Sequence, residues 1–431
     1  MHPSRAGFIT AEIIFSVGLS AILLHGIRGR RDSVDSRIHF EPAPKLMIQR
    51  ILLIGFYIAL AAAVAAFLLI SIDRPHGGWD AWAIWNMRAR FIFRGGDQWT
   101  NAFSVFLGWS HPDYPLLVSV LVARGWKYVG HESIMIPALL SMLFTFATVG
   151  LVCSSLCILR SKSQGLLAGL VLLGTPFLIE NGASQQADVP LGFFFLATLV
   201  LFCLHERLSK ARGLLFLAGM TAGFSVWTKN EGFLFLLSVI IVHFAFIVPT
   251  KGFKAYLGML TPFAAGLLPI LMTVIYFKTQ IAPPNDFLSF AGLRGSVERL
   301  GDISRYGQVF KAFVGGFTQF GHWVVNAPLV LGLYLFLLGT RFEENEKLGI
   351  AMSVASLGVV LTGYFLVYII SPYDLHWHLS TSLSRLLLQT WPSLIFVFFL
   401  LVSTPEQAMF SKEERRPWFD RFFRNKDVGD R

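Results

Sequence analysis

The chain has 431 residues, of which 54% are hydrophobic and only 14% charged, and its formal net charge is +10. Because soluble proteins carry about 25% charged residues, this composition excludes an ordinary soluble globular protein. Repeated apolar runs of about 20 residues predict instead an all-α polytopic membrane protein. The basic residues lie in short loops beside these runs, which favours a role in membrane orientation over nucleic-acid binding, so we expect no nucleic-acid partner.

The apolar runs predict about eleven transmembrane helices. In chain order, we expect them at residues 7–25, 50–72, 133–159, 164–180, 189–205, 213–227, 232–249, 255–277, 324–340, 348–371 and 386–403. The basic stretch His25–Arg31 follows the first run, whereas the charged leader of a signal peptide precedes its apolar run. The first run is therefore expected to be a retained span with its N-terminus outside.

The distribution of Lys and Arg supports this topology. The predicted cytoplasmic segments, with Arg50 beside them, hold 22 of the 36 Lys and Arg residues, although they are shorter in total than the outer segments. We expect one transmembrane domain over residues 1–403 and a basic cytoplasmic tail over 404–431, lying on the anionic inner leaflet. The expected outer loops are 73–132, 181–188, 278–323 and 372–385.

Two helices are expected to lie along the membrane surface within the first large outer loop. The stretch Ala81–Phe93 combines aromatic and basic residues, as interfacial helices do. The stretch Pro115–Arg124 is apolar but too short to cross a bilayer. We expect no separate soluble domain within the chain.

The interiors of the predicted spans contain few ionisable residues, Glu12 and His243 being the exceptions. Ion-coupled transporters hold carboxylates or histidines near the membrane midplane, so this pattern argues against a transporter. Polar residues gather instead at the predicted outer ends of the helices. They are Asp80, His111, Asp113, Tyr114, Asp188, Lys229, Asn230, Glu231, Asp286, Asp374, His376, His378 and Arg385. Because chance would scatter such residues over both faces, we expect a functional site on the outer face.

Several of these residues also have a purely structural interpretation. Asp80 and Asp188 each precede a predicted helix, where a carboxylate caps the first turn. The segment His111–Pro115 contains two prolines and would form a rigid turn.

The basic and histidine residues have alternatives as well. Lys229 and Glu231 would also make a solvated ion pair at the interface. His376 and His378 share a face only in a strand, so they form a weak metal motif. Arg385 lies at a membrane boundary, where arginines often anchor lipid headgroups.

Five segments carry these residues in a recognisable order. They are Gly78–Trp82, His111–Leu117, Ala187–Leu191, Thr228–Gly232 and His378–Arg385. Over about residues 50–400, this order resembles the GT-C superfamily of integral membrane glycosyltransferases. More narrowly, the chain resembles the bacterial relatives of dolichyl-phosphate-mannose protein mannosyltransferases and of the aminoarabinose lipid A transferases.

The resemblance implies a GT-C fold and a polyprenyl-phosphate-linked sugar as donor, transferred with inversion on the outer face. It implies that Asp80 is the general base for the acceptor hydroxyl and that Asp188 is a second acidic residue of the site. Ala81 stands where the protein mannosyltransferases have a second acid, which argues against a protein acceptor. We therefore expect a lipid or glycan acceptor of the cell envelope, such as a lipid-linked glycan or lipid A.

The resemblance also bears on ligands and location. The expected substrate-binding residues are His111, Asp113, Tyr114, Lys229, Glu231, His376, His378 and Arg385. Cationic side chains among them would stabilise a departing phosphate. No cofactor is required, although Asp80, Asp188 and a histidine would offer hard ligands to Mg²⁺, Mn²⁺ or Ca²⁺. We expect a multi-pass protein surrounded by the lipids of the bacterial inner membrane, with its site facing the periplasm or exterior.

Two other functions stay open at this point. A lipid-linked-sugar flippase or transporter would need polar groups through the bilayer, which the apolar spans do not offer. An O-antigen polymerase or ligase would also transfer a sugar, but from a diphosphate-linked donor, and typically has arginines in its outer loops.

Overall fold

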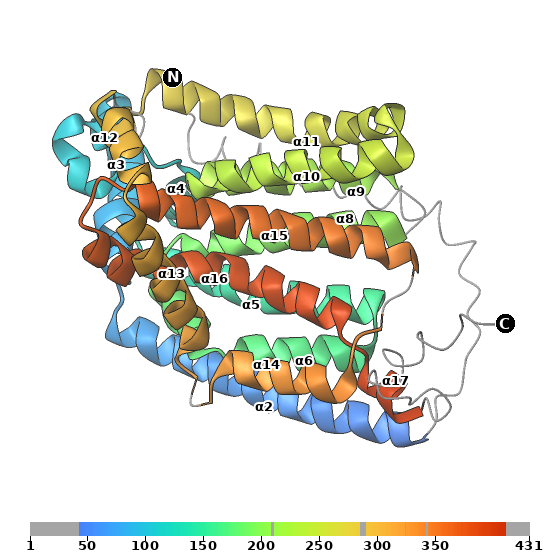
Figure 1. Cartoon of the computed structure of the whole chain (residues 1–431). Coiled ribbons are helices and arrows are strands. Elements are labelled where there is room, and N and C mark those ends of the chain that lie inside the picture. Colours follow the sequence, from blue (N-terminus) through green and yellow to red (C-terminus); the bar gives the residue numbers. More distant parts are fainter. Residues whose placement is uncertain (1–42, 208–210, 285–289, 324, 342–343, 411–431) are drawn as a thin grey trace.

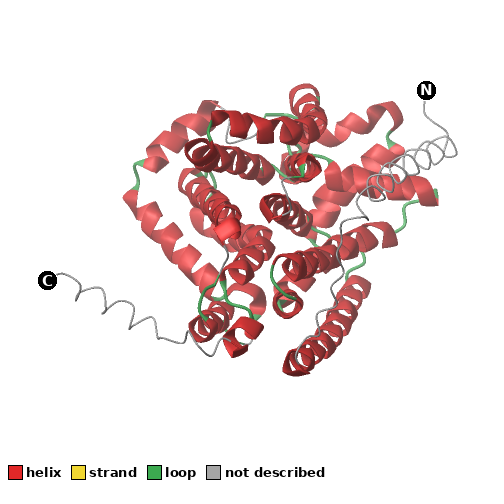
Figure 2. Cartoon of the chain, turned by 90° about the vertical axis from the view of Figure 1, so that its right-hand side faces the viewer, coloured by secondary structure: helices red, strands yellow, loops and turns green. Residues whose placement is uncertain are grey.

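The computed structural model describes residues 43–207, 211–284, 290–323, 325–341 and 344–410. Every regular element within these ranges is a helix (Figures 1 and 2). The expected first span 7–25, most of the expected tail 404–431 and Asp286 lie outside the described residues. The all-α prediction is therefore confirmed for the described part of the chain.

Within the described ranges, eight long helices run side by side and form the bundle seen in Figure 1. They are α2 (Ala43–Asp73), α5 (Met135–Leu159), α8 (Asp188–Arg207), α9 (Arg212–Thr228), α10 (Glu231–Lys251), α11 (Phe253–Gln280), α15 (Glu344–Ile370) and α16 (Leu375–Leu401). Viewed from the right-hand side of Figure 1, the helices of this bundle are seen nearly end-on (Figure 2).

Two further parts of the bundle are bent. Helix α6 (Lys162–Leu173) meets α7 (Pro176–Ala183) at an angle of 62°. Pro176 cannot donate a backbone hydrogen bond, and its ring disfavours a helical conformation at Thr175, which has φ −96° and ψ 95°. Helix α13 (Ile303–Thr318) continues into η6 (Phe320–His322) and turns by 88° into α14 (Ala327–Leu338).

The helices support a multi-pass membrane protein. In the described part of the chain, seven helices are long and apolar enough to cross a membrane, and nine spans result if each bent pair counts as one. Helix α9 has only 17 residues, which is near the minimum for a span. The multi-pass architecture is thus confirmed, whereas the expected number of eleven spans stays a prediction.

One end of the bundle, called the loop end below, carries the short helices that follow α2 (Figure 1). These are η2 (Ala81–Trp85), α3 (Asn86–Arg94), η3 (Gly96–Phe103), η4 (Val105–Ser110) and α4 (Leu117–Val129). Helix α12 (Phe290–Leu300) lies at the same end in Figure 1. Helices α2, α9, α11 and α15 end there, and α5, α8, α10 and α16 begin there.

At the opposite end of the bundle, the buried side chain of Arg160 links several segments of the chain. Arg160 forms an ion pair with Glu346 at 3.1 Å and donates to the backbone oxygens of Arg341 and Val402. These contacts join the segments that follow α5, α14 and α16, next to the short helix α17 (Pro405–Phe410). The two ends of the bundle therefore differ: the loop end carries several short helices, whereas contacts of Arg160 hold the opposite end together.

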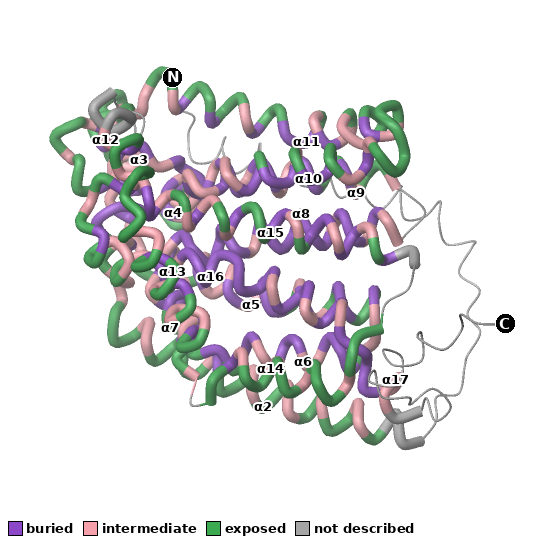
Figure 3. Tube along the Cα trace, in the orientation of Figure 1, coloured by how far each residue is buried: buried purple, intermediate pink, exposed green. Residues whose placement is uncertain are grey.

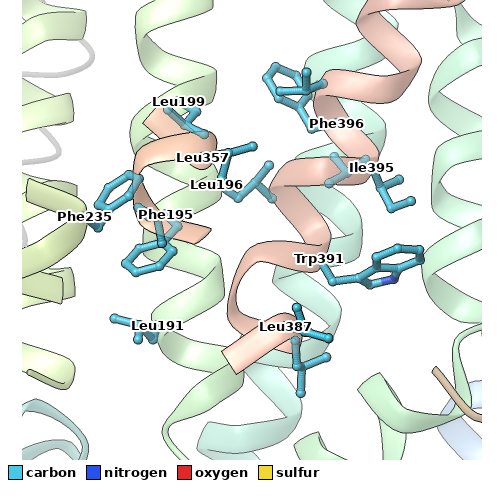
Figure 4. Packing of buried hydrophobic residues seen from close by; sticks show 14 of the residues in the cluster. Leu191, Phe195, Leu196, Leu199, Phe235, Leu357, Leu387, Trp391, Ile395 and Phe396 are labelled. Carbon is cyan, nitrogen blue, oxygen red and sulfur yellow. The ribbon is translucent and has the colours of Figure 1, made fainter. Parts of the chain in front are cut away.

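Helices α8 and α16 form the centre of the bundle. In their most apolar 18-residue stretches, 83% and 78% of the residues are buried, against 11% for α2 (Figure 3). Figure 4 shows Leu191, Phe195 and Leu196 of α8 in the same apolar cluster as Leu387 and other residues of α16. Any side chain that these two helices carry at the loop end is therefore held by well-packed backbone.

The two helices expected along the membrane surface are present but are not simply interfacial. Helices η2 and α3 together span 81–94, and α4 spans 117–129. Trp85 of η2 and Trp126 of α4 are buried, and α4 packs against both α3 and α5, so these two rings face the protein interior. Trp79 and Trp82, in contrast, are exposed.

Candidate functional site

The carboxylate of Asp188 lies at the centre of a charged cluster at the loop end. Asp188 is the first residue of α8, and its side chain is fully buried. Its Oδ1 accepts hydrogen bonds from Lys229 Nζ at 2.9 Å and from Gln389 Nε2 at 2.6 Å. Its Oδ2 accepts one from Arg385 Nε at 2.9 Å. Three donors from α16 and from the turn between α9 and α10 therefore compensate for the burial of this charge.

Arg385 joins the two aspartates to which the sequence points. While its Nε donates to Asp188, its Nη2 donates to Asp80 Oδ2 at 2.6 Å. Asp80 makes no capping hydrogen bond to η2, so its interpretation as a helix cap is wrong. The Asp80 side chain is 18% exposed and that of Arg385 is 22% exposed. Asp80 is thus accessible from outside the protein, whereas Asp188 is not.

The turn between α9 and α10 contributes a second ion pair. Lys229 Nζ lies 2.9 Å from Glu231 Oε1 and is only 4% exposed, so a solvated pair is ruled out for the lysine. Burial alone would lower the pKa of Lys229, but the charges of Asp188 and Glu231 outweigh this effect and raise it. Lys229 is therefore a permanent cation rather than a proton acceptor.

The segment His111–Pro115 packs the rings of His111 and Tyr114 against the charged cluster. The Tyr114 ring is stacked with that of Trp85, at 5.8 Å between ring centres, and with that of His111, at 5.0 Å. Lys229 Nζ lies 5.7 Å from the centre of the Tyr114 ring, which is a favourable distance for a cation–π contact. Burial lowers the pKa of His111, so this imidazole is neutral near pH 7.

A second polar network connects the same segment to α10 and α11. Asn230 donates from Nδ2 to Asp113 Oδ2 at 2.7 Å, and Lys278 Nζ donates to Asn230 Oδ1 at 2.7 Å. Lys278 also donates to the backbone oxygen of Asp113. Asn230 therefore fixes the position of the turn that carries Lys229. In this network, Lys278 is the residue that the sequence analysis missed.

Arg88 of α3 was also not predicted from the sequence. It holds the backbone of the segment His111–Pro115. Its guanidinium donates to the backbone oxygens of Ser110 at 2.6 Å and Tyr114 at 3.1 Å, and also to that of His111. Its side chain is fully buried, and burial lowers its pKa to about 10, which leaves it charged at neutral pH. The left-handed backbone of His111, with φ 49°, lies within the turn that Arg88 holds.

We expect Arg88→Met to loosen this turn without unfolding the bundle. The substitution removes the Arg88 donor from three backbone oxygens, of which that of His111 keeps the Tyr114 amide. A backbone oxygen left without any donor costs about 1–3 kcal/mol if it stays buried. Limited proteolysis of the detergent-solubilised protein should cleave within residues 104–116 at least tenfold faster than in the wild type. Arg124→Met removes an arginine that contacts the Tyr128 ring on α4, and is the matched control. Equal cleavage rates for wild type and Arg88→Met would contradict this role.

A cavity of about 520 Å³ opens next to Arg385. The end of α2, the helix α7 and the first turns of α16 form its walls. The lining residues are Ile70, Asp73, Arg74, Phe177, Glu180, Asn181, Ser184, Gln186, Ser384 and Arg385. Arg385 thus belongs both to the cluster and to the cavity wall, so a ligand in the cavity would contact the cluster through this residue.

The two predicted histidines of α16 are not part of the charged cluster. Residues 375–385 are helical, because α16 begins about three turns before the expected span. His378 Nδ1 lies 2.8 Å from Ser371 Oγ, and its ring packs against that of Tyr368. His376 is exposed. Asp374, in turn, caps α16 by accepting a hydrogen bond from the Trp377 amide at 2.8 Å.

The carboxylates of the cluster are poorly arranged for a divalent cation. Asp80 and Asp188 both accept hydrogen bonds from Arg385, and Asp188 also accepts them from Lys229 and Gln389. Among the described residues, no group of three or more His, Cys, Asp and Glu is placed to hold a metal ion. A metal would have to displace the cationic partners of these two aspartates.

The structure therefore brings together Asp80, Asp188, Lys229, Glu231 and Arg385, and packs His111 and Tyr114 beside them. Asp113 accepts a hydrogen bond from Asn230, the residue that follows Lys229. The arrangement offers an accessible carboxylate, a partly exposed guanidinium and a buried lysine next to a cavity. Comparisons with known proteins add nothing to this geometry, since no family model, curated protein or solved structure matches the chain.

Proposed function

We propose that this protein is a GT-C-type glycosyltransferase of the bacterial inner membrane. It transfers a sugar from a polyprenyl-phosphate-linked donor to a lipid or glycan acceptor of the cell envelope. The observation that carries the proposal is Arg385, which joins Asp80 to the cluster at 2.6 Å and also lines the cavity. A cation that can bind a phosphate is thereby next to a carboxylate that can accept a proton.

In the proposed reaction, Asp80 accepts the proton of the acceptor hydroxyl. The acceptor oxygen forms a bond to the anomeric carbon of the donor, and the bond from that carbon to the phosphate oxygen breaks. Its electron pair leaves with the polyprenyl phosphate, whose charge Arg385 stabilises. Because one displacement occurs, the configuration at the anomeric carbon is inverted. Asp80 is suited to this role because its side chain is partly exposed.

Asp188 has a different role in this proposal. Its side chain has no exposed surface, so it cannot touch an acceptor or a donor without rearrangement. It instead holds Arg385 and Lys229 in place through Oδ2 and Oδ1. Asp188 is therefore a positioning residue, and Lys229 adds a fixed positive charge near the reacting centre.

The membrane setting of the site follows from charge and exposure. The excess of Lys and Arg in the predicted cytoplasmic segments supports a loop end that faces the periplasm or exterior. The cavity lies against the end of α2, and α2 itself is mostly exposed along its apolar length. A polyprenyl chain could thus lie in the bilayer beside α2 while its phosphate reaches the cavity.

A reconstituted assay tests the proposal. The purified protein in lipid vesicles receives a short-chain prenyl-phosphate donor with a labelled sugar and a crude envelope-lipid acceptor. We expect label in the acceptor and an equal amount of free prenyl monophosphate. A flippase would move the donor across the bilayer with its sugar–phosphate bond intact. Consumption of a diphosphate-linked donor alone would point to a polymerase or ligase, and either result would overturn the proposal.

A further inference from the structure

The two contacts of the Arg385 guanidinium differ in accessibility. Its Nε donates to Asp188, which is fully buried and also receives Lys229 and Gln389. Its Nη2 donates to Asp80, which is 18% exposed. The first contact belongs to a buried network, in which removing one partner of an ion pair is costly. The second joins two partly exposed side chains, and Arg385 itself lines the cavity, so an anion there can replace the carboxylate.

We propose that Arg385 exchanges its Nη2 contact between Asp80 and a phosphate anion in the cavity, so that binding of the donor phosphate releases the Asp80 carboxylate. The inference rests on the proposed function, because it states how the donor controls the base. Arg385 stays attached to Asp188 through Nε in both states. Asp80 therefore acts as a competitor of the anion before it acts as a base.

The chemistry of the guanidinium makes this exchange feasible. Arginine presents five donors in a planar fork that matches carboxylate and phosphate equally well, so one anion can replace another with little change of geometry. The acids that line the cavity have partners of their own. Glu180 lies 3.1 Å from His322 Nδ1, and Asp73 lies 3.5 Å from Arg74. Among these lining residues, Arg385 is the cation that is tied to the cluster.

The exchange predicts an order of events. An acceptor that arrives first meets an Asp80 whose Oδ2 is already occupied by the hydrogen bond from Arg385 Nη2. A donor that arrives first takes Nη2, after which Asp80 is free to accept the acceptor proton. The donor phosphate is thereby required for the base to become active.

Binding of a prenyl monophosphate without sugar tests the exchange separately from catalysis. We expect Asp80→Asn to bind a short-chain prenyl monophosphate about fivefold to tenfold more tightly than the wild type. The neutral amide holds Arg385 less strongly than a carboxylate does, so a larger fraction of the protein is ready for the anion. Asp80→Ser should show the same gain, and Asp80→Glu should bind as the wild type does. Calorimetry on the purified full-length protein in detergent measures these affinities.

Glu180→Gln separates the exchange from a general charge effect. This variant also removes one negative charge at the cavity, but Glu180 pairs with His322 rather than with Arg385. We expect its affinity to rise by less than twofold. Equal gains in Glu180→Gln and Asp80→Asn, or no gain in folded Asp80→Asn and Asp80→Ser, would overturn the exchange. If the reconstituted protein transfers no sugar but Asp80→Asn still binds the phosphate more tightly, the proposed function fails while the exchange stands.

Discussion

Asp80→Asn is expected to reduce sugar transfer by about 10²- to 10⁴-fold, which is the usual contribution of a general base. The amide has the shape of the carboxylate but cannot take the acceptor proton. Because Asp80 is partly exposed and Arg385 keeps its ion pair with Asp188, the protein should still fold and insert into the membrane. Transfer of labelled sugar in reconstituted vesicles measures the loss, and size-exclusion chromatography monitors folding.

Glu132→Gln is the matched control for this result. Glu132 is also an acid at the loop end that pairs with arginines, namely Arg90 at 3.4 Å and Arg94. It lies outside the cluster, and ion pairs near the surface contribute only about 0–1 kcal/mol to stability. We expect transfer within twofold of the wild type. Near-normal transfer by Asp80→Asn itself would show that Asp80 is not the base.

Asp188→Ala should cause the largest loss of stability of any single substitution in the cluster. The substitution leaves Lys229, which is 4% exposed, without one of its two carboxylate partners, and it frees Arg385 Nε. Removing one partner of a buried ion pair costs about 3–5 kcal/mol. We expect a strongly lowered midpoint of thermal unfolding in detergent, measured by tryptophan fluorescence, and little recovery of folded protein.

A double variant distinguishes this effect from simple loss of packing. Lys229→Met in the Asp188→Ala background removes the buried cation that has lost one carboxylate partner, so the double variant should be more stable than Asp188→Ala alone. Asp374→Ala removes only the cap of α16 and should lower the free energy of unfolding by roughly 1 kcal/mol, so it is a reference for the size of the Asp188→Ala effect. A thermal midpoint of Asp188→Ala equal to that of the wild type would refute the central position of Asp188.

The sequence predicted most of the fold, because long apolar runs specify membrane helices almost independently of their neighbours. It did not predict the break before Pro176, since a hydropathy pattern continues through a bend. It also placed the start of α16 at residue 386. The polar first turns from Leu375 lower the hydropathy there although they are helical.

The charged members of the cluster could be predicted because a charge at the end of an apolar run is conspicuous. Gln389 was missed because a search for ionisable residues ignores an uncharged amide, although an amide inside an apolar span is itself a signal. Arg88 was missed because its basic neighbours in α3 suggest a surface helix. That Arg385 bridges Asp80 and Asp188 could not be predicted, since about 300 residues separate Asp80 from Arg385 and spacing along the chain does not determine such contacts.

Mass spectrometry of cell-envelope glycans tests the central claim most directly. Cells that make the wild-type protein or Glu132→Gln should carry a glycan or lipid with one additional sugar. Cells that lack the protein, or make Asp80→Asn at the same level in the membrane, should lack that sugar. An identical set of envelope glycans with and without the protein would contradict sugar transfer, and a complete glycan with Asp80→Asn would contradict the role of Asp80.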